Sequence, residues 1–186
     1  FYLSLDFSIA QNYNKLDYVP GIIYALTTDA TDEHLMIGGS FNSSGDGGEY
    51  EFSKYAVMEN GWFINPESGL PSDDSYGIKD FATSHGVVYA GSASDDPLWR
   101  LVKQDALGTW QSLDISVNGT VYALDNLSNG DLLVVGDFTS PFKGAFVYDG
   151  TNIYSLEGFD VGGTPTRAAN FNGKIYIAYL SMPQNY

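Results

Sequence analysis

The stretch DLLVVGDFT at residues 131–139 repeats an earlier one, HLMIGGSF at residues 34–41. Each is a short apolar run that is closed by a glycine, one further residue and a phenylalanine. We call this motif the phrase. Internal repetition of this kind indicates that one structural unit recurs along the chain. Aligning the glycines places Gly39, Gly91 and Gly136 together, and IYIAYLS at 175–181 is a degenerate fourth copy. The repeat is therefore roughly 42 to 52 residues long.

A second apolar run precedes each copy of the phrase, and in three copies a tight turn separates the two. These turns read SHGV at 84–87, SNGD at 128–131 and FNGK at 171–174. Asn-Gly supplies the two positive-φ positions of a type I′ β-turn, so each pair of runs is predicted to be a hairpin. The predicted strands are 22–27, 34–38, 78–83, 87–91, 121–125 and 132–136.

Two further runs follow each copy of the phrase. The third run occupies 52–58, 97–103 and 144–150, and the fourth opens on a large side chain at Trp62, Trp110 and Ile153. Four short strands per repeat, without any helical period, predict an all-β fold, a β-propeller built of four-stranded antiparallel blades. In such a blade the glycine is expected where the backbone turns outward. The large side chain is expected to be buried in the fourth strand.

The predicted organisation is a single propeller domain or propeller fragment over 1–186. It consists of a half blade at 1–17, repeats at 18–69, 70–116 and 117–160, and a half blade at 164–186. Residues 4–17 align on 101–114, which places Tyr13 on Trp110. Two interpretations stay open: a closed ring of four blades in which both ends complete one sheet, or part of a larger propeller. The second is favoured and implies a larger chain or assembly.

Composition limits the classes of partner. Eight basic and 23 acidic residues give a net charge of -15, which repels nucleic acid and anionic membranes. No apolar run approaches the ~20 residues needed to cross a bilayer. The chain has no cysteine, so disulfides and thiolate metal sites are excluded. Few lysines and many small polar residues favour an extracellular or cell-surface location.

Gly38 and Gly39, then Tyr55, and Trp62 after six intervening residues, resemble the kelch repeat. Kelch-like β-propellers include the central domain of galactose oxidase. The sequence of residues 121–156 looks most similar to repeats of secreted and surface proteins such as fungal cortical markers of cell polarity. The resemblance implies a propeller fold but no particular function, because propellers serve many. The glycine pair is single at Gly91 and Gly136, and the last repeat lacks it.

Acidic loops supply the candidate sites. The loop 29–34 carries Asp29, Asp32, Glu33 and His34, whose oxygens and nitrogen suit Ca²⁺ or a transition metal. The glycine-rich loop 42–51 carries Asp46 and Glu49, which suit Ca²⁺. Their alternatives are a solvated turn and a flexible insertion. Asp95, Asp96 and Trp99 are candidates for binding a sugar ring or a protein partner, against core packing of the tryptophan.

Catalytic patterns are few. His34 and His85 are the only imidazoles, no acid pair is marked by spacing, and DALGTW at 105–110 is interpreted as a plain turn. The sequons at Asn42, Asn118 and Asn126 do not exceed chance. The predicted function is a non-enzymatic binding, adhesion or scaffold module, with a protein or glycan partner at its loops. The alternative is a glycan-binding lectin or a glycan-active enzyme, with acids and aromatics gathered at one mouth of the channel.

Overall fold

The computed structural model describes residues 21–44, 51–59, 62–64, 69–70, 77–156, 159 and 163–180. These residues form strands β1 to β14 and one short 3₁₀ helix, η2 (Pro97–Trp99). The predicted half blade at 1–17 lies outside them. The all-β prediction is confirmed.

The strands form four antiparallel sheets, named A to D along the chain. Sheet A contains β1 (Gly21–Thr28), β2 (Leu35–Ser44), β3 (Glu51–Glu59) and β4 (Trp62–Ile64); sheet B contains β5 (Ile78–Ser84), β6 (Val87–Ser92), β7 (Leu101–Gln104) and β8 (Trp110–Ser112); sheet C contains β9 (Thr120–Asn126), β10 (Leu132–Asp137), β11 (Ala145–Tyr148) and β12 (Ile153–Ser155); sheet D contains β13 (Thr164–Phe171) and β14 (Lys174–Leu180). Within each sheet the strands follow one another in sequence order, so every connection joins neighbours.

The predicted strands coincide with observed ones, and β2 extends six residues beyond its expected end. The run 97–103 is only partly a strand. Its first three residues form η2 because Asp96 caps them, accepting a hydrogen bond from Leu98 N at 3.0 Å, and proline stands at the start. The strand β7 then begins at Leu101.

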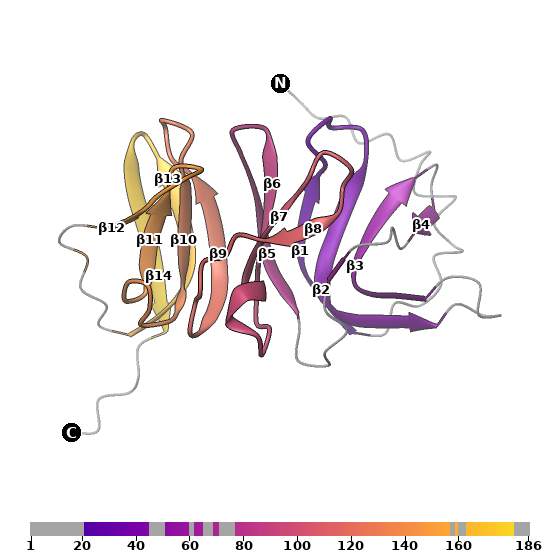
Figure 1. Cartoon of the computed structure of the whole chain (residues 1–186), viewed down its shortest axis with the longest axis horizontal. Helices are drawn as coiled ribbons and strands as arrows, with labels where there is room; N and C mark the ends of the chain where they lie inside the picture. The colour runs from indigo at the N-terminus through magenta and orange to yellow at the C-terminus, as the bar shows by residue number, and fades with distance from the viewer. Residues whose placement is uncertain are drawn as a thin grey trace.

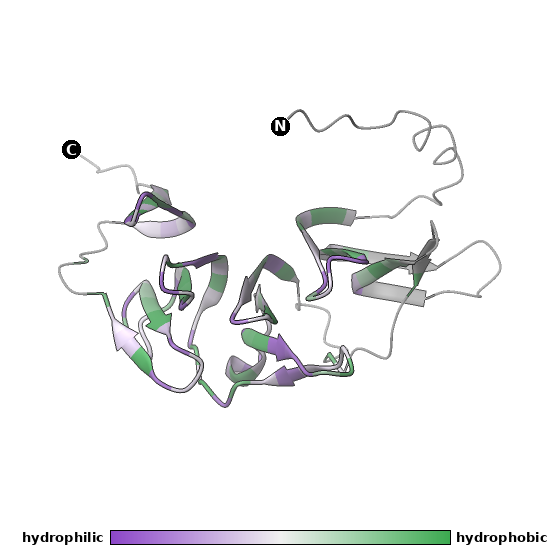
Figure 2. Cartoon of the chain, turned by 90° about the horizontal axis from the view of Figure 1, so that it is seen from above, coloured by the Kyte–Doolittle hydropathy of each residue, from purple (hydrophilic) through white to green (hydrophobic). Residues whose placement is uncertain are grey.

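The first strands of the four sheets lie next to one another. β5 contacts both β1 and β9, and β9 contacts β13. Figures 1 and 2 show the sheets standing in sequence along an arc, each packed face to face on the next. We call the face of a sheet that points toward the following sheet its front and the opposite face its back.

Apolar side chains fill the three junctions between sheets. Sheets A and B meet around Trp110, whose ring lies 5.4 Å from that of Tyr55 and 6.0 Å from that of Phe81. The junction of B and C includes Tyr89 and Val121, and that of C and D includes Leu133, Val135, Ala168 and Ile177. Trp110 is 1% exposed, which confirms the expected burial, whereas Ile153 is only partly buried. Tyr13 and the side chain of Trp62 are outside the described part of the chain.

A β-bulge recurs in the first strand of every sheet. The residue left without a partner in the register is Tyr24 in β1, Lys79 in β5, Tyr122 in β9 and Thr166 in β13. A bulge bends and twists its strand locally, so the same extra residue gives all four first strands the same shape. The bulge therefore marks the equivalent positions of the repeats more accurately than sequence alignment does.

The glycines of the phrase have two separate roles. Gly91 pairs with Asp80, the residue after the bulge, whereas Gly136 pairs with Val121, the residue before it. The alignment of Gly91 with Gly39 and Gly136 is therefore wrong by one residue. A Cβ on Gly91 would lie 2.5 Å from Val121 Cγ1 of the next sheet, and one on Gly136 would lie 2.1 Å from Thr120 O of its own sheet. These glycines allow neighbouring atoms to approach the backbone closely. The prediction that they lie where the backbone turns outward is therefore wrong.

Two of the three hairpin turns have the predicted geometry. His85 and Gly86 have φ of 48° and 74°, and Asn172 and Gly173 have φ of 51° and 71°, as a type I′ turn requires. At 128–131 the prediction is wrong, because only Gly130 has a positive φ. That loop is longer: Leu127 N donates to Asp131 O at 2.8 Å and closes it.

Candidate functional site

The loops fall at two opposite ends of the array. The connections β1–β2, β5–β6, β7–β8, β9–β10, β11–β12 and β13–β14 lie at the end that is uppermost in Figure 1, and we call this end the turn surface. The helix η2 lies at the other end. The acidic loop 29–34 and the residues Asp95, Asp96 and Trp99 are therefore far apart and cannot form one site.

Asp29 organises the loop 29–34. Its Oδ1 accepts hydrogen bonds from Thr31 N at 3.1 Å, Thr31 Oγ1 at 2.9 Å and Glu33 N at 3.0 Å, and its Oδ2 lies 2.7 Å from His34 Nδ1. Burial raises the pKa of this carboxyl, but the bonds from His34, Thr31 and the backbone outweigh it and lower the pKa to about 2. Asp32 accepts from Thr28 Oγ1 at 2.5 Å. The carboxylate oxygens of Asp29 and Asp32, two of the proposed metal ligands, thus hold the loop.

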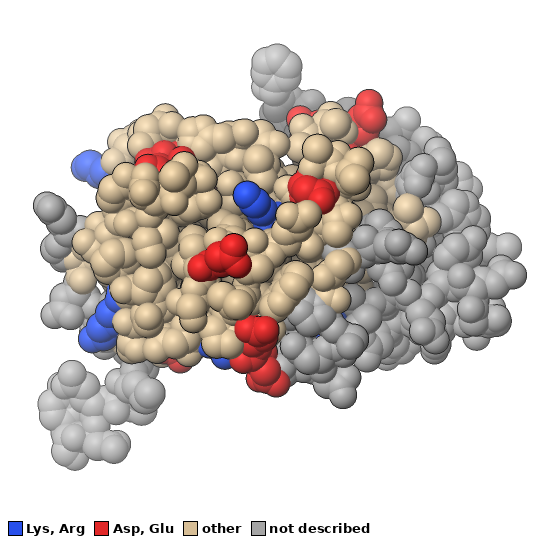
Figure 3. Space-filling model, in the orientation of Figure 1, with Lys and Arg blue, Asp and Glu red and all other residues tan. Residues whose placement is uncertain are grey.

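No group of three or more His, Cys, Asp or Glu side chains in the described residues is placed to hold a metal ion. Asp46 and Glu49 lie outside those residues. On the face seen in Figure 3 the acidic groups occupy several separate places and do not gather in one cluster.

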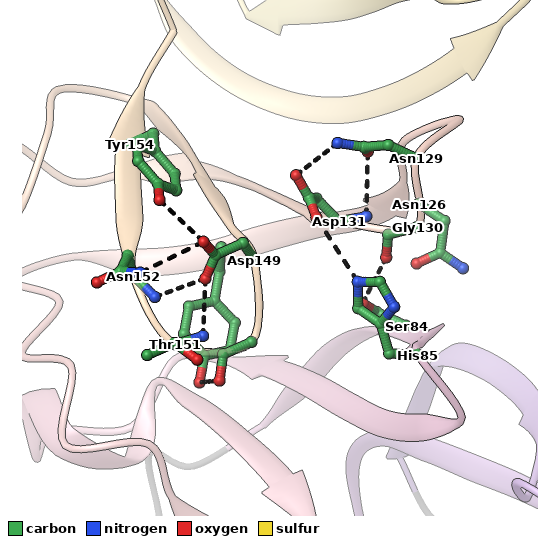
Figure 4. Close-up of polar contacts among 12 residues, drawn as sticks. Ser84, His85, Asn126, Asn129, Gly130, Asp131, Asp149, Thr151, Asn152 and Tyr154 are labelled. Atoms are coloured by element: carbon green, nitrogen blue, oxygen red, sulfur yellow. Dashed lines mark hydrogen bonds and ion pairs between the residues drawn. The ribbon is translucent and has the colours of Figure 1, made fainter.

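Asp149 holds the turn between β11 and β12 (Figure 4). Its Oδ1 accepts from Thr151 N at 2.8 Å and Asn152 N at 2.6 Å, and Tyr154 donates its hydroxyl to Oδ2 at 2.9 Å. The bonds from Asn152 N, Thr151 N and Tyr154 lower the pKa of Asp149 to about 2. Tyr154 remains 50% exposed.

Asp105 has the same place in sheet B, between β7 and β8. It accepts from Leu107 N at 2.9 Å and Thr109 N at 3.0 Å, which confirms that 105–110 begins as a plain turn. The turn presents Leu107, which is 91% exposed. An aspartate directly after the third strand, followed by Gly-Thr or Ala-Leu-Gly-Thr, is the sequence signal that identifies both turns.

Neighbouring hairpins contact each other across the turn surface. Ser84 donates its hydroxyl to Gly130 O at 2.7 Å, and His85 Nε2 lies 3.6 Å from Asp131 Oδ1 (Figure 4). Asn129 Nδ2 in turn donates to Asp131 Oδ2 at 2.7 Å. The turn surface is therefore fixed by bonds within four of its turns and by bonds between the turns of sheets B and C.

At the opposite end, Asp95 and Asp96 are exposed and Trp99 is partly buried against the core between sheets A and B. Arg100 orders this loop, since its Nε donates to Ser94 O at 2.6 Å and its Nη1 to Val117 O at 2.9 Å. Trp99 is thus not presented as an open aromatic platform.

Polar side chains also join the first strands of consecutive sheets, which sequence reasoning missed. Asp80 accepts from Leu124 N at 3.0 Å, joining B to C, and Asp125 accepts from Asn170 N, joining C to D. Asn126 Nδ2 donates to Thr83 O, and Asn170 Nδ2 donates to Asn126 O at 3.0 Å. Thr83, Asn126 and Asn170 occupy the same position after the bulge in their strands. The recurrence of Asn at one repeat position was the available signal.

Asp80 is an acid whose surroundings raise its pKa. Burial raises its pKa, and the hydrogen bonds from Leu124 N and Phe81 N oppose that rise. Two sequons also have structural roles. Asn118 accepts from Thr139 N at 2.8 Å and Ser140 N at 3.0 Å, and Asn126 belongs to the bonds between sheets. The side chain of Asn42 lies outside the description.

No protein-family model matches the chain, and a search of curated proteins finds no match. In the described residues no helix is long and apolar enough to cross a membrane.

Proposed function

We propose that the chain is a non-enzymatic β-propeller-type module that binds a partner outside the cell through its turn surface. The sheets, their common bulge and their face-to-face packing support a propeller of the kelch-like type, in which the first strands surround a central axis. The composition, poor in lysine and rich in small polar residues, supports the extracellular location.

The observation that carries this proposal is the use of the carboxylates. Asp29, Asp105 and Asp149 each hold the turn in which they stand, and Asp80 and Asp125 each join two sheets. A general acid or base must be free to exchange a proton with substrate, whereas these groups are engaged by the backbone. Fixed turns on a rigid scaffold are instead the usual arrangement of a binding surface.

The charge of the turn surface points to the partner. It carries the carboxylates of Asp29, Asp32, Glu33, Asp105, Asp131 and Asp149, with Lys174 as the only lysine or arginine in these described turns and at their strand ends. A protein partner with a basic face fits such a surface, because complementary charge speeds and orients association. The exposed side chains of Leu107 and Tyr154 supply apolar contact within it.

The test is a binding screen of the isolated chain against extracellular proteins and glycans, with turnover followed in parallel. We expect Leu107→Ala and Tyr154→Ala to weaken binding of a protein ligand, and Leu98→Ala, on the opposite end, to leave it unchanged. Turnover of a glycan that a single Asp or Glu substitution abolishes would overturn the non-enzymatic proposal. Loss of binding in Leu98→Ala alone would move the site to the other end.

A further inference from the structure

The three junctions between sheets use the same position on the front face. On the second strand of each sheet, one residue pairs with the third residue after the bulge of the first strand. In sheets A, B and C this residue is Met36, Tyr89 and Leu133, respectively, and each is buried against the next sheet. The equivalent residue in sheet D is Tyr176, which pairs with Ala169 and is 54% exposed. The front of sheet D therefore has the pattern of a junction face without a described sheet upon it.

The back faces repeat in the same way. Phe81 and Leu124, each the second residue after a bulge, are buried against the preceding sheet, and Ala168 packs there too. The equivalent residue in sheet A is Leu26, which is 64% exposed. In the described residues, the front of sheet D and the back of sheet A are thus not covered by another sheet. In each of the three junctions the front of one sheet packs on the back of the next, so these two faces are complementary.

These two faces lie at opposite ends of the arc (Figure 2). The described strands of sheet A pack on sheet B and those of sheet D on sheet C. We infer that the front of sheet D docks on the back of sheet A of a second copy of this chain, head to tail. A heterologous contact of this kind closes into a ring or continues as an open chain, depending on the rotation between copies.

The internal junctions predict which residues meet. Gly38 faces Ile78, since a Cβ added to Gly38 would lie 2.6 Å from Ile78 Cγ2, and Gly91 faces Val121 in the same way. The equivalent residues on the open faces are Ala178 on sheet D and Ile23 on sheet A. Among the described strands, β14 pairs only with β13.

The absence of cysteine makes a direct test possible. A Cβ added to Gly91 would lie 3.2 Å from Val121 Cβ of the next sheet. This is close to the ~3.8 Å that separates the two Cβ atoms of a disulfide. Ile23→Cys and Ala178→Cys, purified separately, mixed and oxidised, should give a mixed disulfide dimer in about tenfold excess over either homodimer. A dominant Ala178→Cys homodimer would show a symmetric contact and overturn the inference. In the double variant, an internal disulfide at monomeric mass would show closure within one chain and would also overturn it.

Sedimentation tests the same contact without cysteine. The unmodified chain should associate reversibly, and Tyr176→Glu or Leu26→Glu should each raise the dissociation constant about tenfold or more. Mixing these two variants should restore a heterodimer, because each keeps one intact face, while Leu98→Glu serves as the matched control. A chain that stays monomeric at every concentration would overturn the inference. It depends on packing alone, so loss of ligand binding at the turn surface leaves it unaffected.

Discussion

Substitution of Gly91 tests whether the repeated phrase sets the spacing between sheets. A Cβ at this position would lie 2.5 Å from Val121 Cγ1, within the range that forces a neighbour to move. Valine cannot give way easily, since branching at its Cβ restricts the rotation of the side chain about χ1. Gly91→Ala should therefore push sheets B and C apart or distort β6.

The expected cost follows from overpacking a buried junction. One inserted methyl group in a well-packed core costs about 1 to 3 kcal/mol. For a chain of this size each kcal/mol lowers the melting temperature by about 2 to 4 °C, so the shift should be measurable. Gly77→Ala is the matched control, because its nearest contact would be 3.5 Å from Lys79 Nζ, an ordinary distance.

Thermal and urea unfolding of four proteins provides the assay: the unmodified chain, Gly91→Ala, Val121→Ala and the double variant. Val121→Ala removes the methyl group that Gly91→Ala meets, so the two substitutions should be coupled and the double variant should lose less stability than the sum of the single ones. Equal losses in Gly91→Ala and Gly77→Ala, or simple additivity, would refute the close-approach explanation.

The remaining predictions concern the core and the carboxylates. Trp110→Ala should cost about 3 to 5 kcal/mol in urea unfolding, because the ring is buried between sheets A and B; retained stability with loss of a ligand would show a binding role instead. Asp80 has a folded pKa above the ordinary value of 3.8, so its ionisation removes stability as the pH rises through that raised value; Asp80→Asn should lack this decline, and an unchanged pH profile would contradict the raised pKa. Asp149 has a folded pKa near 2, so its contribution is complete above pH 3.8 and disappears as the pH falls toward 2; the difference in stability between Asp149→Ala and the unmodified chain should shrink over that interval. The difference in melting temperature between millimolar CaCl₂ and chelator should be the same for Asp29→Asn as for the unmodified chain, since the oxygens of Asp29 already hold the loop. A CaCl₂-induced rise that Asp29→Asn abolishes would show that the loop is a Ca²⁺ site.

Strand positions could be predicted from the sequence because apolar runs and Gly-containing turns act locally. The pairs His85–Gly86 and Asn172–Gly173 adopt the predicted turn from their own backbone preferences. The role of Gly91 could not be predicted, since it depends on Val121 in another sheet and on a bulge at Lys79 that leaves no composition signal.

Candidate ligands were harder to predict than strands. Carboxylates in loops serve equally as metal ligands and as acceptors for backbone N–H groups, and the sequence alone does not distinguish the two. The structure places Asp29 in the second role and separates it from Asp95 and Asp96, because successive connections of an antiparallel sheet alternate between its ends. The role of Asp125 could not be predicted, since its partner Asn170 is 45 residues away in the sequence.

Hydrogen exchange at two amides tests most directly whether polar side chains unite the sheets into one scaffold. Leu124 N and Asn170 N belong to β9 and β13, which are edge strands of their sheets, and donate to Asp80 and Asp125 of the preceding sheets. We predict slow exchange at both amides, with exchange at Leu124 accelerated in Asp80→Ala and exchange at Asn170 unchanged in that variant. Fast exchange at both amides in the unmodified chain, at the rate of free sheet edges, would contradict the account.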